Sequence, residues 1–267
     1  MNKGSSLQEA YLSRLEKQRR KIMAARILLA LAFFLLWETA ADRGWIDSFF
    51  FSSPSRLGRL FLSMWRDGSL FLHVGITLTE TLVSFALVVV IGLAVSLLLW
   101  LSDSVFQVLE PYLVILNSLP KSALAPLLIV WLGANSRTII VAGMSVAIFG
   151  TILNLYTGFT ETSREKIRLI YTLHGTKKDA LTKVVLPSTV PMIISIMKVN
   201  IGLCLVGVVI GEFIGARNGL GYLIIYGSQV FQLDLVILSI LILCLMAMLL
   251  YGGVTAAEKL YHRRQHA

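Results

Sequence analysis

Residues 72–101 read LHVGITLTETLVSFALVVVIGLAVSLLLWL. This stretch contains one acidic residue, Glu80, and no Lys or Arg in thirty positions. About 20 apolar helical residues cross a hydrocarbon core of about 30 Å, so the stretch can span a membrane with some tilt. Backbone groups in lipid must be hydrogen-bonded internally, and the stretch lacks the period-two alternation of a barrel strand. It is therefore predicted to be a transmembrane α-helix.

Five further apolar runs reach a similar length, so the chain is predicted to be an all-α integral membrane protein with six transmembrane helices. The third expected span, 105–131, is interrupted by Pro111, Pro120 and Pro126. The remaining expected spans are 22–41, 138–159, 190–214 and 233–254.

The composition supports a membrane protein over a soluble one. Hydrophobic residues make up 56% of the 267 positions and charged residues only 15%, whereas a soluble domain carries about 25% charged residues. The net charge is +9, but the basic residues cluster beside apolar runs, which is typical of topology signals. No nucleic-acid partner is expected, whereas membrane lipid is.

The distribution of Lys and Arg predicts the orientation. With six spans, the N-terminal segment 1–21, the loop after the fourth span and the C-terminal tail share one side, with fifteen basic residues against six on the other. Basic residues favour the cytoplasmic side, so both termini are predicted to be cytoplasmic. Segment 1–21 is polar and basic and is not expected to be a cleavable signal.

The chain is predicted to consist of the basic segment 1–21 and a membrane domain, 22–267, that carries a cytoplasmic element at 160–188. Apolar residues recur at helical spacing in this element, for example Ile167, Ile170 and Tyr171. We expect two short helices hinged near His174-Gly175. Such a pair could present a compact knob to a soluble partner, or lie on the membrane surface as an amphipathic pair.

A family resemblance is carried by residues 168–187, RLIYTLHGTKKDALTKVVLP. They resemble the cytoplasmic motif of permease subunits of binding-protein-dependent ABC importers, in particular the branch that serves nitrate, sulfonates, taurine and thiamine-precursor pyrimidines. That motif reads Glu-Ala-Ala, three residues, Gly, nine residues, then Ile-x-Leu-Pro. Its last part matches 184–187, whereas Arg168 and His174 replace its first residue and its glycine. Gly175, one position later, is expected to make the turn.

Further stretches are similar to the same family, in the same order along the chain. Residues 119–127, LPKSALAPL, resemble its Pro-x-x-Ala-Leu-x-Pro-Leu segment in the third span. Residues 51–55 resemble its Leu-Pro-Ser-Pro segment, and 211–213 with 219–221 resemble its close. The resemblance covers about 51–231 and implies a type I ABC importer permease-like bundle in the cytoplasmic membrane.

The resemblance also implies partners: an ATP-binding subunit, an extracytoplasmic substrate-binding protein and a second copy of this chain. Because the chain has no Gly-x-x-x-x-Gly-Lys-Ser/Thr phosphate loop, we expect another polypeptide to hydrolyse ATP and this chain to be a transport subunit, not an enzyme. The residues implied to couple the two subunits are Arg168, His174, Gly175, Val184, Leu186 and Pro187.

Polar residues inside the spans are candidates for the substrate pathway, because a charge in lipid costs about 3 kcal/mol. Prolines free backbone carbonyls beside Asn117, Ser118 and Lys121, which could therefore face a pathway. Lys121 could instead contact a carboxylate or lie near an interface. Glu212 could line an outer gate or serve as a structural cap or salt-bridge partner. Glu80 is expected to reach water near the end of its span.

No cofactor or metal site is predicted, because the two cysteines and four histidines show no metal-like spacing. The expected substrate is an anion of the sulfonate, nitrate or taurine type, and a thiamine-precursor pyrimidine is the alternative within the family. The rivals from other classes are an ion-coupled secondary transporter and a membrane scaffold. A secondary transporter would predict inverted repeats with broken helices in both halves, but only the third span is interrupted by proline.

Overall fold

The structure, a computed structural model, describes residues 3–265, which form helices joined by short turns. In chain order the helices are α1 (Lys3–Asp42), α2 (Ser48–Phe51), α3 (Pro54–Arg66), α4 (Ser69–Leu101), α5 (Asp103–Ser118), α6 (Lys121–Leu132), α7 (Ser136–Thr160), α8 (Arg164–Thr172), α9 (Lys177–Ala180), the π-helical turn η1 (Leu181–Val185), α10 (Leu186–Gly215), α11 (Leu220–Gln229) and α12 (Leu233–Gln265). The chain divides into unit 1, Met1–Ser63, and unit 2, Met64–Ala267.

Unit 1 is dominated by the long helix α1, whose apolar part, within Lys17–Asp42, is long enough to cross a membrane and buries no side chain inside the protein. The helix ends in a Schellman motif. Gly44 adopts a left-handed φ of 70°, and the amide of Trp45 donates to the carbonyl of Ala40 at 2.9 Å. Glycine is well suited here because it has no Cβ to oppose this conformation.

The core of unit 2 is the packing of α7 between α4 and α10. Helices α4 and α7 run in the same direction, because Ser84 donates to the carbonyl of Ile140 and Ser96 to that of Ile152. Helix α10 runs the opposite way and approaches α7 closely. A Cβ at Gly207 would lie 2.8 Å from the Cα of Gly143, so glycine at this position allows the two backbones to meet.

The prediction of six spans is confirmed, with one difference. Within residues 3–265, five helices are individually long and apolar enough, and α5 and α6 make a sixth span only as a pair bent by 95°. The bend lies at Leu119-Pro120, where Leu119 is extended. Proline removes a backbone donor and disfavours helical geometry in the residue before it, so the helix ends there. Pro111 and Pro126 lie inside α5 and α6 without breaking them.

Of the two short helices expected in 160–188, the first is confirmed as α8. The second is not separate: α9 continues through η1 directly into α10. Pro187 explains the π-helical turn, because its ring cannot fit against the carbonyl four residues earlier in regular α-helical geometry. Lys177–Gly215 is therefore one extended helical segment with a single widened turn.

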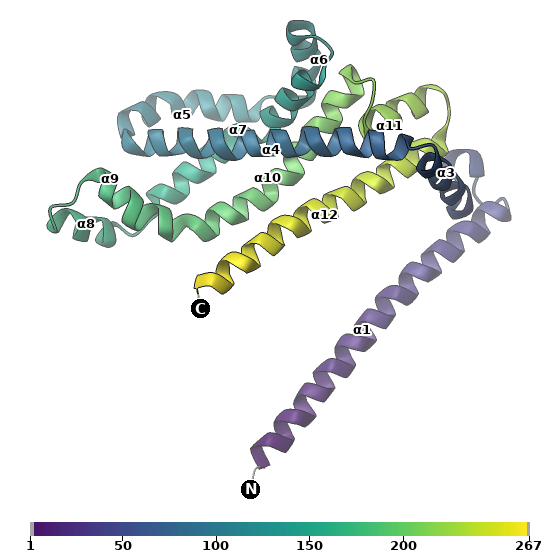
Figure 1. Ribbon diagram of the computed structural model, residues 1–267, viewed down its shortest axis with the longest axis horizontal. Helices are drawn as coiled ribbons and strands as arrows, with labels where there is room; N and C mark the ends of the chain where they lie inside the picture. The colour runs from purple at the N-terminus through teal and green to yellow at the C-terminus, as the bar shows by residue number, and fades with distance from the viewer. Residues whose placement is uncertain (1–2, 266–267) are drawn as a thin grey trace. The chain divides into compact units, whose positions relative to one another are not determined.

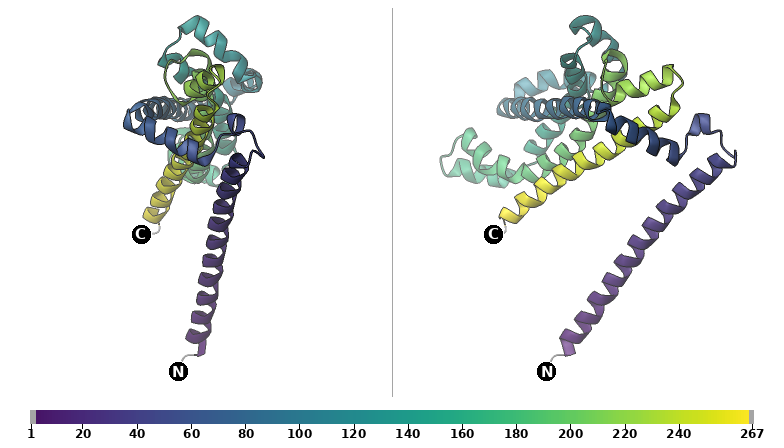
Figure 2. Two further views of the ribbon diagram at one scale, coloured as in Figure 1. Left: turned by 90° about the vertical axis from the view of Figure 1, so that its right-hand side faces the viewer. Right: turned by 45° about the vertical axis from the view of Figure 1, so that its right-hand side comes forward.

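Figure 1 shows that α8 and α9 lie at one end of unit 2 and α11 lies at the other. We call these the α8 end and the α11 end. Helix α6 projects on the side of unit 2 away from α12, as the additional views in Figure 2 also show. The α11 end includes the turns 133–135 and 216–219, since α7 begins and α10 ends there.

Candidate functional site

The turn after α8 is made by His174, which adopts a left-handed φ of 59°. The amide of His174 donates to the carbonyl of Tyr171 at 3.0 Å, and that of Gly175 donates to the carbonyl of Ile170 at 2.9 Å. These two bonds form a Schellman motif in which the position usually taken by glycine is occupied by histidine. The expectation that Gly175 makes the turn is therefore wrong: the left-handed residue is His174, the position of the family's motif glycine.

Gly175 is required for a different reason. A Cβ at this position would lie 2.9 Å from the carbonyl oxygen of Ile170, closer than real Cβ contacts come. Gly175 thus allows the chain leaving α8 to pass directly beside the helix. The two neighbouring residues thus have different roles: His174 reverses the chain direction, and Gly175 allows the backbone to pass close to the carbonyl of Ile170.

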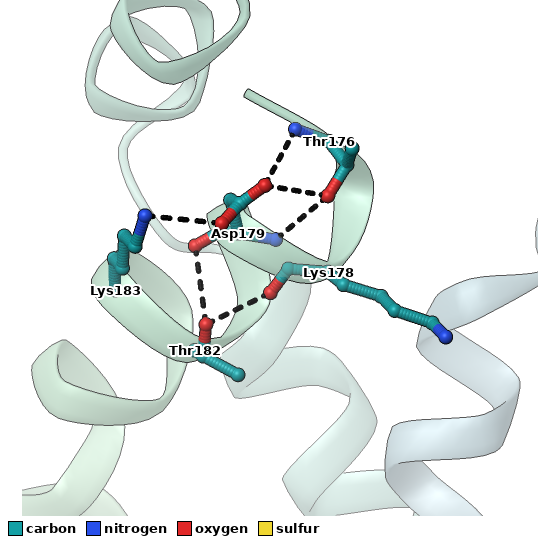
Figure 3. Close-up of polar contacts among 5 residues, drawn as sticks. All are labelled: Thr176, Lys178, Asp179, Thr182 and Lys183. Carbon is teal, nitrogen blue, oxygen red and sulfur yellow. Dashed lines mark hydrogen bonds and ion pairs between the residues drawn. The ribbon is translucent and has the colours of Figure 1, made fainter.

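The helix that follows begins with a capping box, drawn in Figure 3. The amide of Thr176 donates to the carboxylate of Asp179 at 2.9 Å, and the amide of Asp179 donates to the Thr176 hydroxyl at 3.2 Å. The ammonium of Lys183 lies 3.0 Å from the same carboxylate. This arrangement satisfies amides that a helix start leaves without partners, so α9 has a defined beginning.

The inner face of this element packs on the ends of α4 and α7. Ala180 and Val185 are fully buried in a cluster with Trp100, Leu155 and Phe159. The ammonium of Lys177 also lies 5.3 Å from the centre of the Trp100 ring, which is a cation–π distance. The element is therefore attached to the membrane helices by a hydrophobic core and cannot swing freely.

Apolar side chains on α8 and at its C-terminal cap are exposed. Leu169 and Leu173 are 59% and 70% exposed, and Tyr171 is 46% exposed. The six predicted coupling residues divide between the two faces. Arg168, His174 and Pro187 are exposed, whereas Gly175, Val184 and Leu186 are half-buried toward the core. Leu169 and Leu173 were not singled out by the sequence analysis, which named Tyr171 for its helical spacing and assigned none of the three residues to a face.

An open cavity of about 190 Å³ lies where the end of α5 meets the middle of α7 and α10. Its polar lining consists of amide and hydroxyl groups from Asn117, Thr151, Asn154, Ser195 and Asn200. The Asn200 amide donates to the Thr151 hydroxyl at 2.8 Å, and both side chains are buried. The Asn117, Asn154 and Ser195 side chains are exposed at the mouth. The arrangement can offer several hydrogen bonds to a small solute.

Three of the four predicted pathway residues gather near this cavity. Asn117 lines it. Ser118 lies beside the helix break and donates to the carbonyl of Val114 at 2.8 Å. Lys121, the first residue of α6, donates to the carbonyl of Leu116 and lies over the ring of Phe149, with its Nζ 5.2 Å from the ring centre. Among the described residues Lys121 has no carboxylate partner.

Glu212, the fourth, lies at the α11 end, away from that cavity. It is fully buried and accepts hydrogen bonds from the Thr77 hydroxyl and the Gly221 amide, both at 2.6 Å. Thr77 in turn accepts from the Leu220 amide at 2.8 Å, and His73 accepts from the Gly219 amide at 3.0 Å. We call His73, Thr77, Glu212 and these three amides the Glu212 cluster.

The partners of Glu212 were not predicted, although α4 carries a usable signal. Four polar residues of this apolar helix follow one another at steps of four, three and four positions, which places them on one face: His73, Thr77, Glu80 and Ser84. All four are buried. Glu80 in particular is only 3% exposed, contrary to the expectation, because α4 turns this face toward α10 and α7.

Comparison with known proteins adds the family context. A family model described as binding-protein-dependent transport system inner membrane component matches residues 88–265. A probable ABC transporter permease protein of Haemophilus influenzae is 30% identical over 237 residues, which are 89% of this chain and 95% of that protein. The formylaminopyrimidine transport permease protein of Halalkalibacterium halodurans is 27% identical, covering 87% and 92%. The taurine transport system permease protein of Escherichia coli is 24% identical, covering 84% and 83%.

The fold is also similar to that of solved structures. An inward-facing structure of the MetNI methionine ABC transporter aligns with a TM-score of 0.62 at 20% identity, covering 69% of this chain and 92% of the matched chain. At this identity the similarity concerns the helical architecture alone.

Proposed function

This chain belongs to the family of binding-protein-dependent transport system inner membrane components and is the permease subunit of an ABC importer; from this premise we propose how it is driven, assembled and loaded. A separate ATP-binding subunit docks at the α8 end. Two copies of the chain form the pathway, and an extracytoplasmic binding protein delivers a small anion of the sulfonate, nitrate or taurine type. In this arrangement the α8 end and both termini are cytoplasmic.

The observation that carries the docking proposal is the contrast between the two faces of the 164–185 segment. Its inner face is buried against α4 and α7, while Leu169 on α8 and Leu173 directly after it are exposed one helical turn apart. An exposed apolar patch beside charged residues is typical of a protein-binding surface. Since the inner face is fixed in the core, a displacement of the docked subunit would be transmitted to the membrane helices.

Exposed polar groups support the pairing of two copies. Asn117, Asn154 and Ser195 are exposed on the surface of a single chain at spans that are otherwise apolar. Polar side chains in the hydrocarbon region face other helices or a water-filled cavity, because lipid offers them no hydrogen bonds. A second copy placed over this cavity would shield these groups from lipid and enclose a pathway between the two chains.

The substrate proposal rests on the cavity and on Lys121. The lining supplies amide N–H and hydroxyl O–H donors, and Lys121 is the adjacent charge, without a carboxylate to neutralise it. Sulfonate, nitrate and taurine carry oxygen atoms that accept such bonds. In a medium of low dielectric constant a positive charge beside these donors favours an anion.

A second substrate class, a thiamine-precursor pyrimidine, is favoured by one specific observation. No charged side chain lines the cavity itself. A neutral heterocycle with amino and ring nitrogen atoms could be bound by its amides and hydroxyls alone, as suits a relative of a formylaminopyrimidine permease. Uptake measured for both classes in wild type and Lys121→Gln separates them, since the substitution would weaken anion uptake and leave pyrimidine uptake unchanged.

The docking proposal is tested by isolating the tagged chain from its native membrane in mild detergent and identifying the proteins that accompany it. We expect an ATP-hydrolysing subunit, lost in Leu173→Asp and retained in Thr172→Asp. The control introduces the same charge on the same turn without removing apolar surface. Uptake into liposomes by the chain alone, without ATP, would instead support an ion-coupled transporter.

A further inference from the structure

Glu80 is a buried carboxyl group whose two oxygens make no hydrogen bond of regular geometry among the described residues, although the Ser136 hydroxyl and the Glu212 carboxyl group lie near it. Its side chain is only 3% exposed, and neither of its carboxyl oxygens is within hydrogen-bonding geometry of a donor among the described residues. Glu212, which faces it, is differently placed because both of its oxygens accept a hydrogen bond. A buried ionised carboxylate is costly unless a counter-charge or donors compensate it, so Glu80 lacks a component that would stabilise it.

Glu80 lines an open cavity of about 170 Å³ at the α11 end. The other polar lining groups are on Asn135, Ser136, Arg217 and Asn218, all exposed, so the cavity is open to a solute from the surface. The cavity also meets the C-terminal end of α10 at Gly215. Carbonyl groups in the last turn of a helix lack amide partners and give this end a partial negative charge.

These groups together specify the charge of an occupant. The carboxyl group of Glu80, the hydroxyl of Ser136 and the end of α10 present oxygen atoms or negative potential to the cavity. Arg217 is the cation in the lining, yet its side chain is exposed and it does not bond to Glu80. Arg217 repels any cation that enters the cavity, and this repulsion is twice as large for a divalent ion as for a monovalent ion at the same distance. The presence of Arg217 therefore argues against a divalent ion.

We propose that this cavity binds a monovalent cation through Glu80, either a sodium ion or the ammonium group of a small solute. Oxygen ligands of this kind suit hard cations, and an ammonium group can donate up to three hydrogen bonds to them. The site is separate from the cavity lined by Asn117 and does not depend on which anion or pyrimidine the permease carries. The proposed cation site is also independent of whether an ATP-binding subunit docks at the α8 end.

The test is thermal unfolding of the full chain in lipid nanodiscs, with sodium chloride, methylammonium chloride or choline chloride at equal ionic strength. A bound cation stabilises the folded state, so sodium or methylammonium should raise the midpoint by about 3 °C or more relative to choline. A rise with sodium alone identifies a metal-ion site, and a rise with methylammonium alone identifies an ammonium site. No rise with either would overturn the proposal.

Two variants and one control make the test specific. Glu80→Gln should abolish the rise, whereas the exposed control Glu161→Gln should retain it. Arg217→Gln removes a repelling charge and should lower the cation concentration at half-maximal effect several-fold. A full rise in Glu80→Gln, or weaker cation binding in Arg217→Gln, would contradict the assignment. The Arg217 variant keeps the proposal testable if Glu80→Gln does not fold.

Discussion

At the α8 end, the polar contacts of Thr176, Asp179 and Lys183 join residues three or four positions apart and are largely exposed. At the α11 end, Glu212 and its neighbours are buried and join α4 to residues 135 to 146 positions away. The first set defines the shape of one short element. The second set holds three separate segments of the chain together.

This difference predicts how each end responds to damage. A local contact at the surface competes with water and contributes little, so its loss changes one turn. A buried contact between distant segments leaves unpaired groups in the core when one partner is removed. Substitutions at the α8 end should therefore leave the fold intact while impairing function. Substitutions in the Glu212 cluster at the α11 end should instead destabilise the fold.

The largest effect is expected for Glu212→Ala. It removes the acceptor for the Thr77 hydroxyl and the Gly221 amide, leaving both buried and unpaired, and should lower the free energy of unfolding by about 3 kcal/mol. Thermal unfolding in detergent measures this. The control Glu161→Gln, at the α8 end, should have the same unfolding midpoint as wild type. An unchanged midpoint for Glu212→Ala would contradict the stabilising role of the Glu212 cluster.

Gly219→Ala tests the same cluster through its backbone. Gly219 has φ of 118°, and an added Cβ would lie 2.7 Å from Oε2 of Glu212, so we expect a loss of about 2 kcal/mol. Gly202 is the matched control, since a Cβ there meets nothing within 4 Å. If both glycine variants unfold at the same temperature, the close packing around Glu212 is not what makes Gly219 necessary.

Thr176→Ala should have a smaller effect, confined to the α8 end. The hydroxyl caps α9 by accepting from the Asp179 amide, and loss of such a cap costs about 1 kcal/mol. Hydrogen exchange should rise for the amides of 176–180 and stay unchanged for those of the Glu212 cluster. Faster exchange at both ends would mean that the two ends are not independent.

His174→Gly should be mildly stabilising, by about 0.5 kcal/mol, because glycine adopts the left-handed conformation without a Cβ penalty but loses more entropy on folding. Chemical denaturation measures the change. His174→Ala, which keeps the penalty, is the control and should not be stabilising. A destabilised glycine variant would show that the imidazole makes a compensating contact.

The sequence permitted reliable prediction of what depends on near neighbours. Apolar runs located the spans, and helical spacing located α8. Three prolines marked the third span as interrupted, and Pro120 is the one of them that lies at the break. The motif alignment placed the family's glycine on His174 and the turn was expected at Gly175, whereas the left-handed residue is His174. A left-handed histidine could not be foreseen from residue preferences, because the surrounding bonds to Tyr171 and Ile170 impose it.

What the sequence did not reveal depends on packing between distant segments. The burial of Glu80 and the bonds of Glu212 arise only when α4 lies against α10, and no local rule specifies that pairing. Lys198 is similar: it forms an ion pair with Glu258 of α12, sixty positions away. The exposure of Leu169 and Leu173 likewise follows from the way α8 packs against α9 and η1.

The continuous helical segment from Lys177 to Gly215 can act mechanically as a lever. Its 39 residues correspond to roughly 58 Å of helix, and its close contact with α7, at Gly207 and Gly143, can serve as a fulcrum. Because the fulcrum lies near Gly215, the arm toward the α8 end is the longer one. A sideways displacement of several ångströms at Lys177 would therefore be reduced and reversed at Glu212, where buried contacts tolerate only small movements.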